Sequence, residues 1–105
     1  MCSSDLVATG LSAAGTTLGT ATALNATVNI MSTVASGSGV SLYSAQVGDE
    51  MEVYNGGANA LKVYPDSSSN NINQLSAGSA MNLSPNVGCK YRKVSATQWV
   101  AYLSA

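Results

Sequence analysis

The sequence predicts an all-β fold, a small antiparallel β-sandwich or barrel that follows a short N-terminal arm. Three observations predict it. Apolar and polar residues alternate over several short segments, and turn residues separate these segments roughly every 8 to 12 positions. No window of about 12 residues has helical spacing without a Gly or a run of β-branched residues. A chain of 105 residues has room for one such domain. The pattern leaves Greek-key and jelly-roll topologies open.

Residues 1–17 are expected to form a flexible arm, and residues 18–105 the β domain. The arm is small and polar, and Gly10 and Gly15 interrupt any periodicity. It has too little bulky apolar surface to offset its own conformational entropy, so we expect it to become ordered against a neighbouring subunit. Its candidate partner contacts are the apolar residues Leu6, Val7 and Leu11.

The strands are expected from residue 18 onward. Leu18 to Leu24 alternates with a period of two, and β-branched residues continue the alternation from Val28 to Val34. Shorter strands and a closing hairpin are expected further along, at 40–43, 72–75 and 80–83, and at 89–94 with 98–103.

The stretch from Glu50 to Tyr64 predicts a second β-hairpin. If the five residues 55–59 form its loop, Val53 lies opposite Leu61, and Glu52 lies opposite Lys62. Apolar side chains then face apolar ones, and opposite charges face each other. A slip of one residue would turn every side chain to the wrong face, so the agreement of loop length with pairing supports this register.

The composition argues against catalysis and against nucleic-acid binding. The chain has no His, which is the commonest general base and the commonest transition-metal ligand. Its five carboxylates and four basic residues give a net charge of -1, too little positive charge to attract phosphates. We therefore expect no enzymatic activity, no cofactor, no metal and no nucleic-acid partner.

Three features with possible chemistry are interpreted as structural. The carboxylates of Asp49, Glu50 and Glu52 match no calcium loop and are expected on a solvated sheet face. Cys89 is expected in the core, with a reactive thiolate beside the basic residues at 90 and 92 as the alternative. Trp99 is expected in the core because the chain has no Phe to fill it.

The ends and the hydropathy of the chain predict its location. No stretch is as long and apolar as a membrane span. A signal peptide requires basic residues near its start, and no basic residue precedes Lys62. We expect a protein made in a host cytoplasm, without a signal peptide and without a membrane partner.

Three of the four basic residues lie within four positions of one predicted strand. They are Lys90, Arg92 and Lys93. One interpretation is a set of solvated charges that protects a strand from unwanted pairing. The other is a local patch that contacts an acidic partner surface, and on this interpretation the three residues are candidate partner contacts.

Four stretches, in this order, resemble a family of short β-rich virion proteins of tailed bacteriophages. The stretches are 21–30, 46–49, 53–65 and 96–99. The most specific is the turn Asn-Gly-Gly-Ala-Asn-Ala-Leu-Lys-Val-Tyr-Pro at 55–65, followed near the end by Ala-Thr-Gln-Trp. The resemblance extends from about Thr16 to Leu103. The segment 89–93 carries more charge than the family leads us to expect.

The resemblance implies a homo-oligomer, often a trimer, on the outside of a virion and without enzymatic activity. Members of the family are capsid decoration (cement) proteins, head fibres or modules of longer fibres. We expect a decoration protein that binds the major capsid protein lattice and stabilises the capsid. The alternative is a head-fibre or tail-fibre module that recognises host surface glycans through Tyr43, Tyr64 or Tyr102.

Overall fold

The computed structural model describes residues 7–104, apart from 25, 43–45 and 74. Over these residues the chain forms ten strands and no helix, which confirms the predicted all-β class. The strands are β1 (Val7–Ser12), β2 (Thr22–Ala23), β3 (Val28–Thr33), β4 (Gly39–Ser41), β5 (Glu50–Asn55), β6 (Leu61–Tyr64), β7 (Asn71–Ile72), β8 (Met81–Leu83), β9 (Val87–Lys93) and β10 (Gln98–Ser104).

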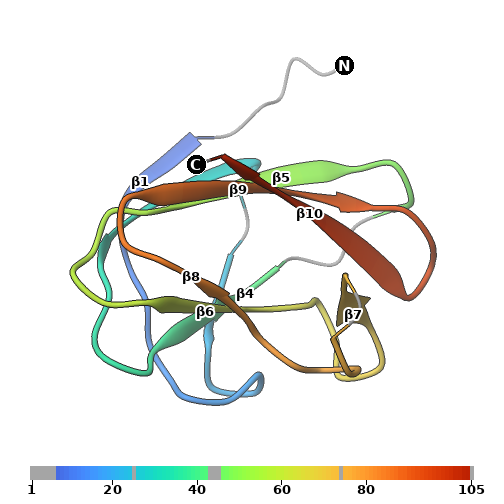
Figure 1. Ribbon diagram of the computed structural model, residues 1–105, viewed down its shortest axis with the longest axis horizontal. Coiled ribbons are helices and arrows are strands. Elements are labelled where there is room, and N and C mark those ends of the chain that lie inside the picture. Colours follow the sequence, from blue (N-terminus) through green and yellow to red (C-terminus); the bar gives the residue numbers. More distant parts are fainter. Residues whose placement is uncertain (1–6, 25, 43–45, 74, 105) are drawn as a thin grey trace.

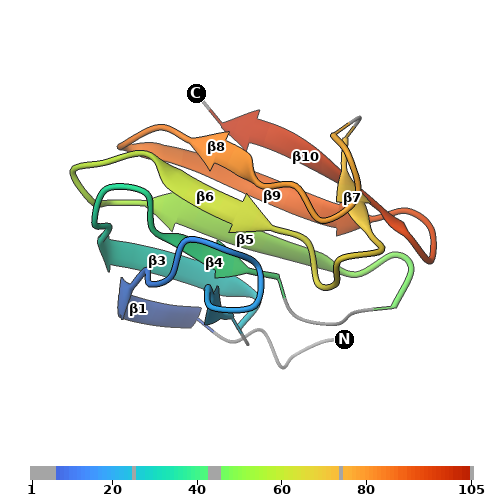
Figure 2. The ribbon, with the colours of Figure 1, turned by 90° about the horizontal axis from the view of Figure 1, so that it is seen from below.

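The strands belong to two sheets that lie in separate layers (Figures 1 and 2). Sheet A has the order β1-β3-β5-β9-β10-β7, and sheet B has the order β2-β4-β6-β8. From β1 to β6 the chain alternates between the sheets, and each strand from β3 onward pairs in parallel with the strand two places earlier. The chain therefore winds as a stack of turns instead of folding back on itself.

The winding of β1 to β6 is typical of a β-solenoid. Val7, Val28 and Glu52 are register partners in successive turns, so one turn takes roughly 20 residues, at the short end for repeat proteins. The last strands break the pattern, because β8 and β9 run antiparallel to β6 and β5, and β10 runs antiparallel to β9. The strands of the predicted closing hairpin therefore do pair, whereas the turns before them differ from a Greek key or jelly roll.

The predicted hairpin between Glu50 and Tyr64 is wrong. Its two strands, β5 and β6, belong to different sheets, so Glu52 pairs with Val28 and Lys90 and does not face Lys62. A strand with one buried face shows the same alternation in either sheet, so the pattern could not reveal which neighbour it takes.

The segment after β5 crosses from sheet A to sheet B instead of reversing within one sheet. Asn55 is fully buried, and its amide nitrogen donates to the carbonyl oxygens of Asn59 and Leu83, both at 2.8 Å. The backbone nitrogen of Gly56 donates to the carbonyl of Met31. A Cβ atom at Gly57 would lie 2.7 Å from the Val34 side chain, so the close approach of the crossing segment requires glycine.

The N-terminal region differs in detail from the sequence expectation. Val7–Ser12, inside the residues assigned to the arm, forms the edge strand β1 beside β3. Within the expected strand Leu18–Leu24, only Thr22–Ala23 is extended. The Thr20 hydroxyl accepts hydrogen bonds from the backbone nitrogens of Thr16 and Thr17, and such local bonds compete with strand pairing.

The core lies between the two sheets and takes side chains from both. Trp99 and Tyr91 are its largest members and are fully buried. Cys89 is also buried, so the core positions predicted for Trp99 and Cys89 are confirmed. The aliphatic and thioether residues that are fully buried with them are Met31, Val40, Met51, Val53, Leu61, Val63, Ile72 and Leu83.

Candidate functional site

The candidate functional site is the face of sheet A that points away from the core, which we call the outer face. It carries exposed apolar, aromatic and charged side chains together. A groove of about 880 Å³ runs over this face. The outward side chains that line it are Val28 and Ile30 of β3, Glu50, Glu52 and Tyr54 of β5, Lys90 and Arg92 of β9, and Tyr102 of β10.

Strand alternation places these side chains. In β5 the residues Met51, Val53 and Asn55 are fully buried, so the residues between them point outward. In β9 the same alternation buries Cys89, Tyr91 and Lys93 and turns the residues at 90 and 92 to the outer face. The pairing of β5 with β9 then places acidic and basic columns side by side.

The charges of the outer face are balanced across the two strands. Glu50 is the register partner of Arg92, and Glu52 is the register partner of Lys90. The Arg92 guanidinium forms an ion pair with the Glu50 carboxylate, and the two side chains are 49% and 33% exposed. An ion pair this exposed contributes little to stability, so its main effect is to fix the positions of two charges.

Two tyrosines add exposed aromatic surface to the groove. The exposed fractions of Tyr54 and Tyr102 are 37% and 51%. A Cβ atom at Gly88 would lie 3.4 Å from the Tyr54 ring, so the glycine leaves this ring room beside β9. Tyrosine combines an apolar ring with a polar hydroxyl, which makes it common in interfaces with proteins and other ligands.

Three of the predicted partner contacts lie on the outer face. Val7 is 62% exposed and is the register partner of Val28, whose side chain lines the groove. Lys90 and Arg92 are both exposed, and Lys90 lies in the same row of register partners as Val28. The structure therefore gathers one residue of the N-terminal stretch and two basic residues of β9 on one surface.

The other predicted contacts do not lie there. Leu11 is the register partner of the buried Met31 and packs against the core. Lys93 is only 7% exposed, so its expected place in an exposed basic patch is wrong. The alternation of β9 explains this burial, because Lys93 shares the inward face with Cys89 and Tyr91. Leu6 lies outside the described residues.

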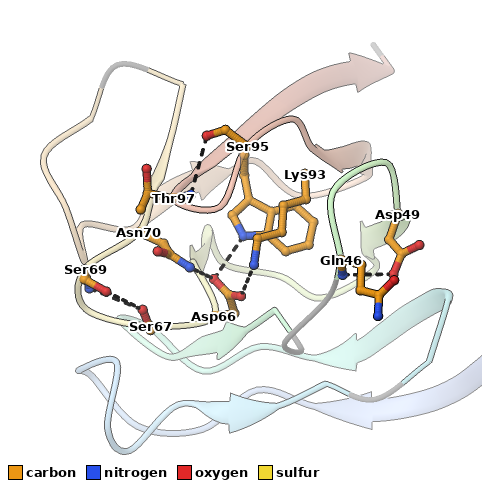
Figure 3. A network of polar contacts seen from close by, with 10 residues as sticks. Gln46, Asp49, Asp66, Ser67, Ser69, Asn70, Lys93, Ser95 and Thr97 are labelled. Atoms are coloured by element: carbon orange, nitrogen blue, oxygen red, sulfur yellow. Dashed lines mark hydrogen bonds and ion pairs between the residues drawn. The ribbon is translucent and has the colours of Figure 1, made fainter.

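A second polar site lies inside the molecule and was missed by sequence reasoning. We call it the Asp66 cluster, and it consists of Asp66, Asn70, Lys93 and Trp99 (Figure 3). The Asp66 carboxylate accepts hydrogen bonds from the Lys93 ammonium at 2.9 Å, from the Trp99 indole nitrogen at 3.0 Å, and from the Asn70 amide. The ammonium also lies 5.8 Å from the centroid of the Trp99 ring.

Two opposing effects set the pKa of Asp66. Burial by itself raises the pKa of Asp66, but the hydrogen bonds from Asn70, Lys93 and Trp99, together with the charge of Lys93, outweigh it. The pKa of Asp66 consequently lies below its ordinary value. The carboxylate is held as an anion by fixed donors, and its side chain is only 4% exposed.

The remaining groups with possible chemistry are structural within the described residues. Burial raises the pKa of the Cys89 thiol, which opposes formation of the reactive thiolate. Burial also raises the pKa of Tyr91 far above its ordinary value, and the neighbouring Cys89 adds to this effect. In the part of the chain that is described, no three His, Cys, Asp or Glu side chains gather as metal ligands would. That part also contains no helix that could span a membrane.

Comparisons with protein families, with curated proteins and with solved structures find no match for this chain. The outer face, the Asp66 cluster and the sequence itself are therefore the features that bear on function.

Proposed function

We propose that the chain is a structural virion protein that decorates and stabilises a tailed-phage capsid. It acts by binding rather than by catalysis. The binding form is a homo-oligomer, a trimer, which sits on the major capsid protein lattice at the outer capsid surface. Its fold is a short β-solenoid closed by antiparallel strands rather than a β-sandwich or barrel. The observation that carries the proposal is the outer face, where Val7, Lys90 and Arg92 lie with two exposed tyrosines.

The outer face has the composition of a protein-binding surface. Tyrosine and arginine are enriched at the energetic centres of interfaces, and both are present there. The ion pair between Glu50 and Arg92 presents a fixed charge pattern to a partner. Exposed apolar residues beside these charges, among them Val7, supply surface that a partner would cover.

Assembly on a capsid also suits a domain of this size. A chain of 105 residues buries only about two thirds of the surface that its unfolded form exposes, which leaves it with modest stability by itself. Contacts with further copies and with a lattice add buried surface and thereby stabilise the folded state.

The proposal is tested by mixing the purified chain with expanded empty heads of the phage that encodes it and measuring co-sedimentation. We expect stoichiometric binding and heads that resist heat better. Lys90→Glu reverses a charge on the outer face and is expected to weaken binding. Lys62→Glu makes the same change on a residue that points outward from sheet B, and it serves as the matched control.

Two results would contradict the proposal. The first is a lack of binding by the unmodified chain at saturating concentration. The second is equal loss of binding in Lys90→Glu and Lys62→Glu while both variants keep the β-sheet circular dichroism of the parent chain, because this would remove the outer face from the interface.

A glycan-binding fibre module remains the second candidate, and the two exposed tyrosines of the groove support it. Of the residues predicted for this role, Tyr102 is exposed, whereas Tyr64 is buried and its hydroxyl donates to the Thr16 carbonyl at 2.9 Å. Tyr43 lies outside the described residues. Specific signals on a glycan array that disappear in Tyr102→Ala, with no binding to heads, would favour this function.

A further inference from the structure

We propose that Lys93 and Asn70 become joined by an intramolecular amide bond, formed after folding with Asp66 as the proton relay. Such a bond is a covalent modification of the Asp66 cluster. The inference depends on this cluster alone, so it is independent of the outer face and of the proposed role in a virion.

The Asp66 carboxylate holds a nitrogen donor on each of its two oxygens. The Oδ2 atom of Asp66 accepts from the Lys93 Nζ atom at 2.9 Å, and the Oδ1 atom accepts from the Asn70 Nδ2 atom (Figure 3). An amine that could attack and an amide nitrogen that could leave are thus held by the two oxygens of the same group. A carboxylate in this position can take a proton from one nitrogen and give a proton to the other.

Water has little access to the Lys93 and Asp66 side chains. The side chains of Lys93 and Asp66 are 8% and 4% exposed, and Trp99 is fully buried against them. In water the lysine amine is protonated and does not attack an amide. A dry site disfavours separated charges and lowers the cost of moving the ammonium proton onto the carboxylate. The lowered pKa of Asp66 favours the ion pair, so we expect a slow reaction that continues after folding.

Hydrogen bonds fix the backbone on both sides of the cluster. The Asn70 backbone nitrogen donates to the Ser67 carbonyl, and the Asn70 carbonyl accepts from Gly78. The Lys93 backbone nitrogen donates to the Asp49 carbonyl at 3.0 Å, and its carbonyl accepts from Gly48 at 2.7 Å. A fold that fixes both backbone segments lowers the entropy cost of bringing their side chains together.

The reaction balances without any co-reactant. The Lys93 ammonium gives a proton to the Asp66 carboxylate, and the free Nζ atom attacks the Asn70 Cγ atom. The new Nζ–Cγ bond forms, the Cγ–Nδ2 bond breaks, and Asp66 returns its proton to the departing nitrogen. The attacking nitrogen loses a further proton to that nitrogen through the carboxylate. One ammonium ion leaves, the Asp66 carboxylate is regenerated, and no electrons are transferred to or from another molecule.

The test is the intact mass of the folded chain after overnight incubation at neutral pH, measured under denaturing conditions. We expect most molecules to be lighter than the translated sequence by one ammonia. Trypsin should then release a branched peptide in which 63–90 is joined to 93–105, because an amide at Lys93 blocks cleavage there. Asn70→Ala lacks the acceptor carbon and is expected to show no loss of ammonia and two separate peptides.

The branched peptide is the deciding measurement. A succinimide at Asn55-Gly56 also releases ammonia, but it leaves the two tryptic peptides separate, and that result would overturn the proposal. An unchanged mass in folded protein would overturn it as well. Loss of water instead of ammonia would indicate an amide between Lys93 and Asp66 and would contradict the assignment to Asn70. The mass and the tryptic peptides of the chain of parent sequence decide whether the amide bond forms. The test therefore does not depend on the folding of any variant.

Discussion

Arg92 and Lys93 are adjacent in β9, and each forms an ion pair, yet the two pairs lie in opposite environments. Arg92 reaches Glu50 on the outer face, where both side chains are partly exposed to water. Lys93 reaches Asp66 between the sheets, where both side chains are almost inaccessible. Strand alternation alone separates them, so one step along a strand decides whether a positive charge is available to a partner or stabilises the interior.

The comparison shows that the same attraction has different consequences in the two places. On the outer face, solvent weakens the pair, and its loss exposes nothing that water cannot solvate. Inside, both charges have given up their hydration, so either one left alone is costly. We therefore expect the inner pair to control folding and the outer pair to control binding.

The largest expected effect is that of Asp66→Ala. It leaves the Lys93 ammonium and the Trp99 indole nitrogen without their acceptor, and removal of one partner of a buried pair costs about 3 to 5 kcal/mol in the free energy of unfolding. Urea denaturation followed by tryptophan fluorescence measures it. Glu50→Ala, which removes the acid of the outer pair, is the matched control. Equal losses in the free energy of unfolding of the two variants would contradict the expected difference between the inner and the outer ion pair.

A smaller effect is expected on acidification. The folded pKa of Asp66 lies below its ordinary value of 3.8, so the ionised carboxylate stabilises the folded chain. This contribution is fully present above the ordinary value and is lost as the pH falls through the folded pKa. Urea denaturation at successively lower pH should show a steeper loss of stability in the chain of parent sequence than in Asp66→Asn.

The same measurement bears on the proposed amide bond. Molecules in which Lys93 has become an amide carry no ammonium beside Asp66, so their acid-induced loss should be smaller than that of molecules with the free amine. Equal slopes for the two forms, separated by mass, would show that the charge of Lys93 contributes little to the pKa of Asp66.

The smallest expected effect on stability is that of Arg92→Ala. The exposed pair with Glu50 is worth about 0 to 1 kcal/mol in the free energy of unfolding. The same variant should nevertheless weaken binding to empty heads, because it removes a fixed charge of the outer face. A loss of stability as large as that of Asp66→Ala, or unchanged binding, would contradict the division between the two pairs.

Local alternation carried much of the fold and part of the site. It predicted the all-β class and the closing strands, and residue type predicted the buried positions of Cys89 and Trp99. It did not predict the parallel winding, because a loop of hairpin length at 55–59 serves here as a crossing between sheets. The contacts that make the difference, from Asn55 to Leu83 and from Gly56 to Met31, join residues far apart in the sequence.

Local alternation likewise predicts one part of the candidate sites and not the other. The alternation of β9 was sufficient to separate Lys93 from the residues at 90 and 92, although charge alone suggested one patch. Asp66 gave no comparable signal, because it follows Pro65 in a polar loop and its partners Lys93 and Trp99 lie 27 and 33 residues away. Only the three-dimensional winding brings that loop against the end of β9.

The stacked turns formed by β1 to β6 also bear on how such a chain can change in evolution. Each of these turns touches mainly the turns beside it, so a segment of one turn's length can be duplicated or deleted while the closing strands keep their places. Relatives of different length are then expected to differ by whole turns near the N-terminus, with the C-terminal closure retained.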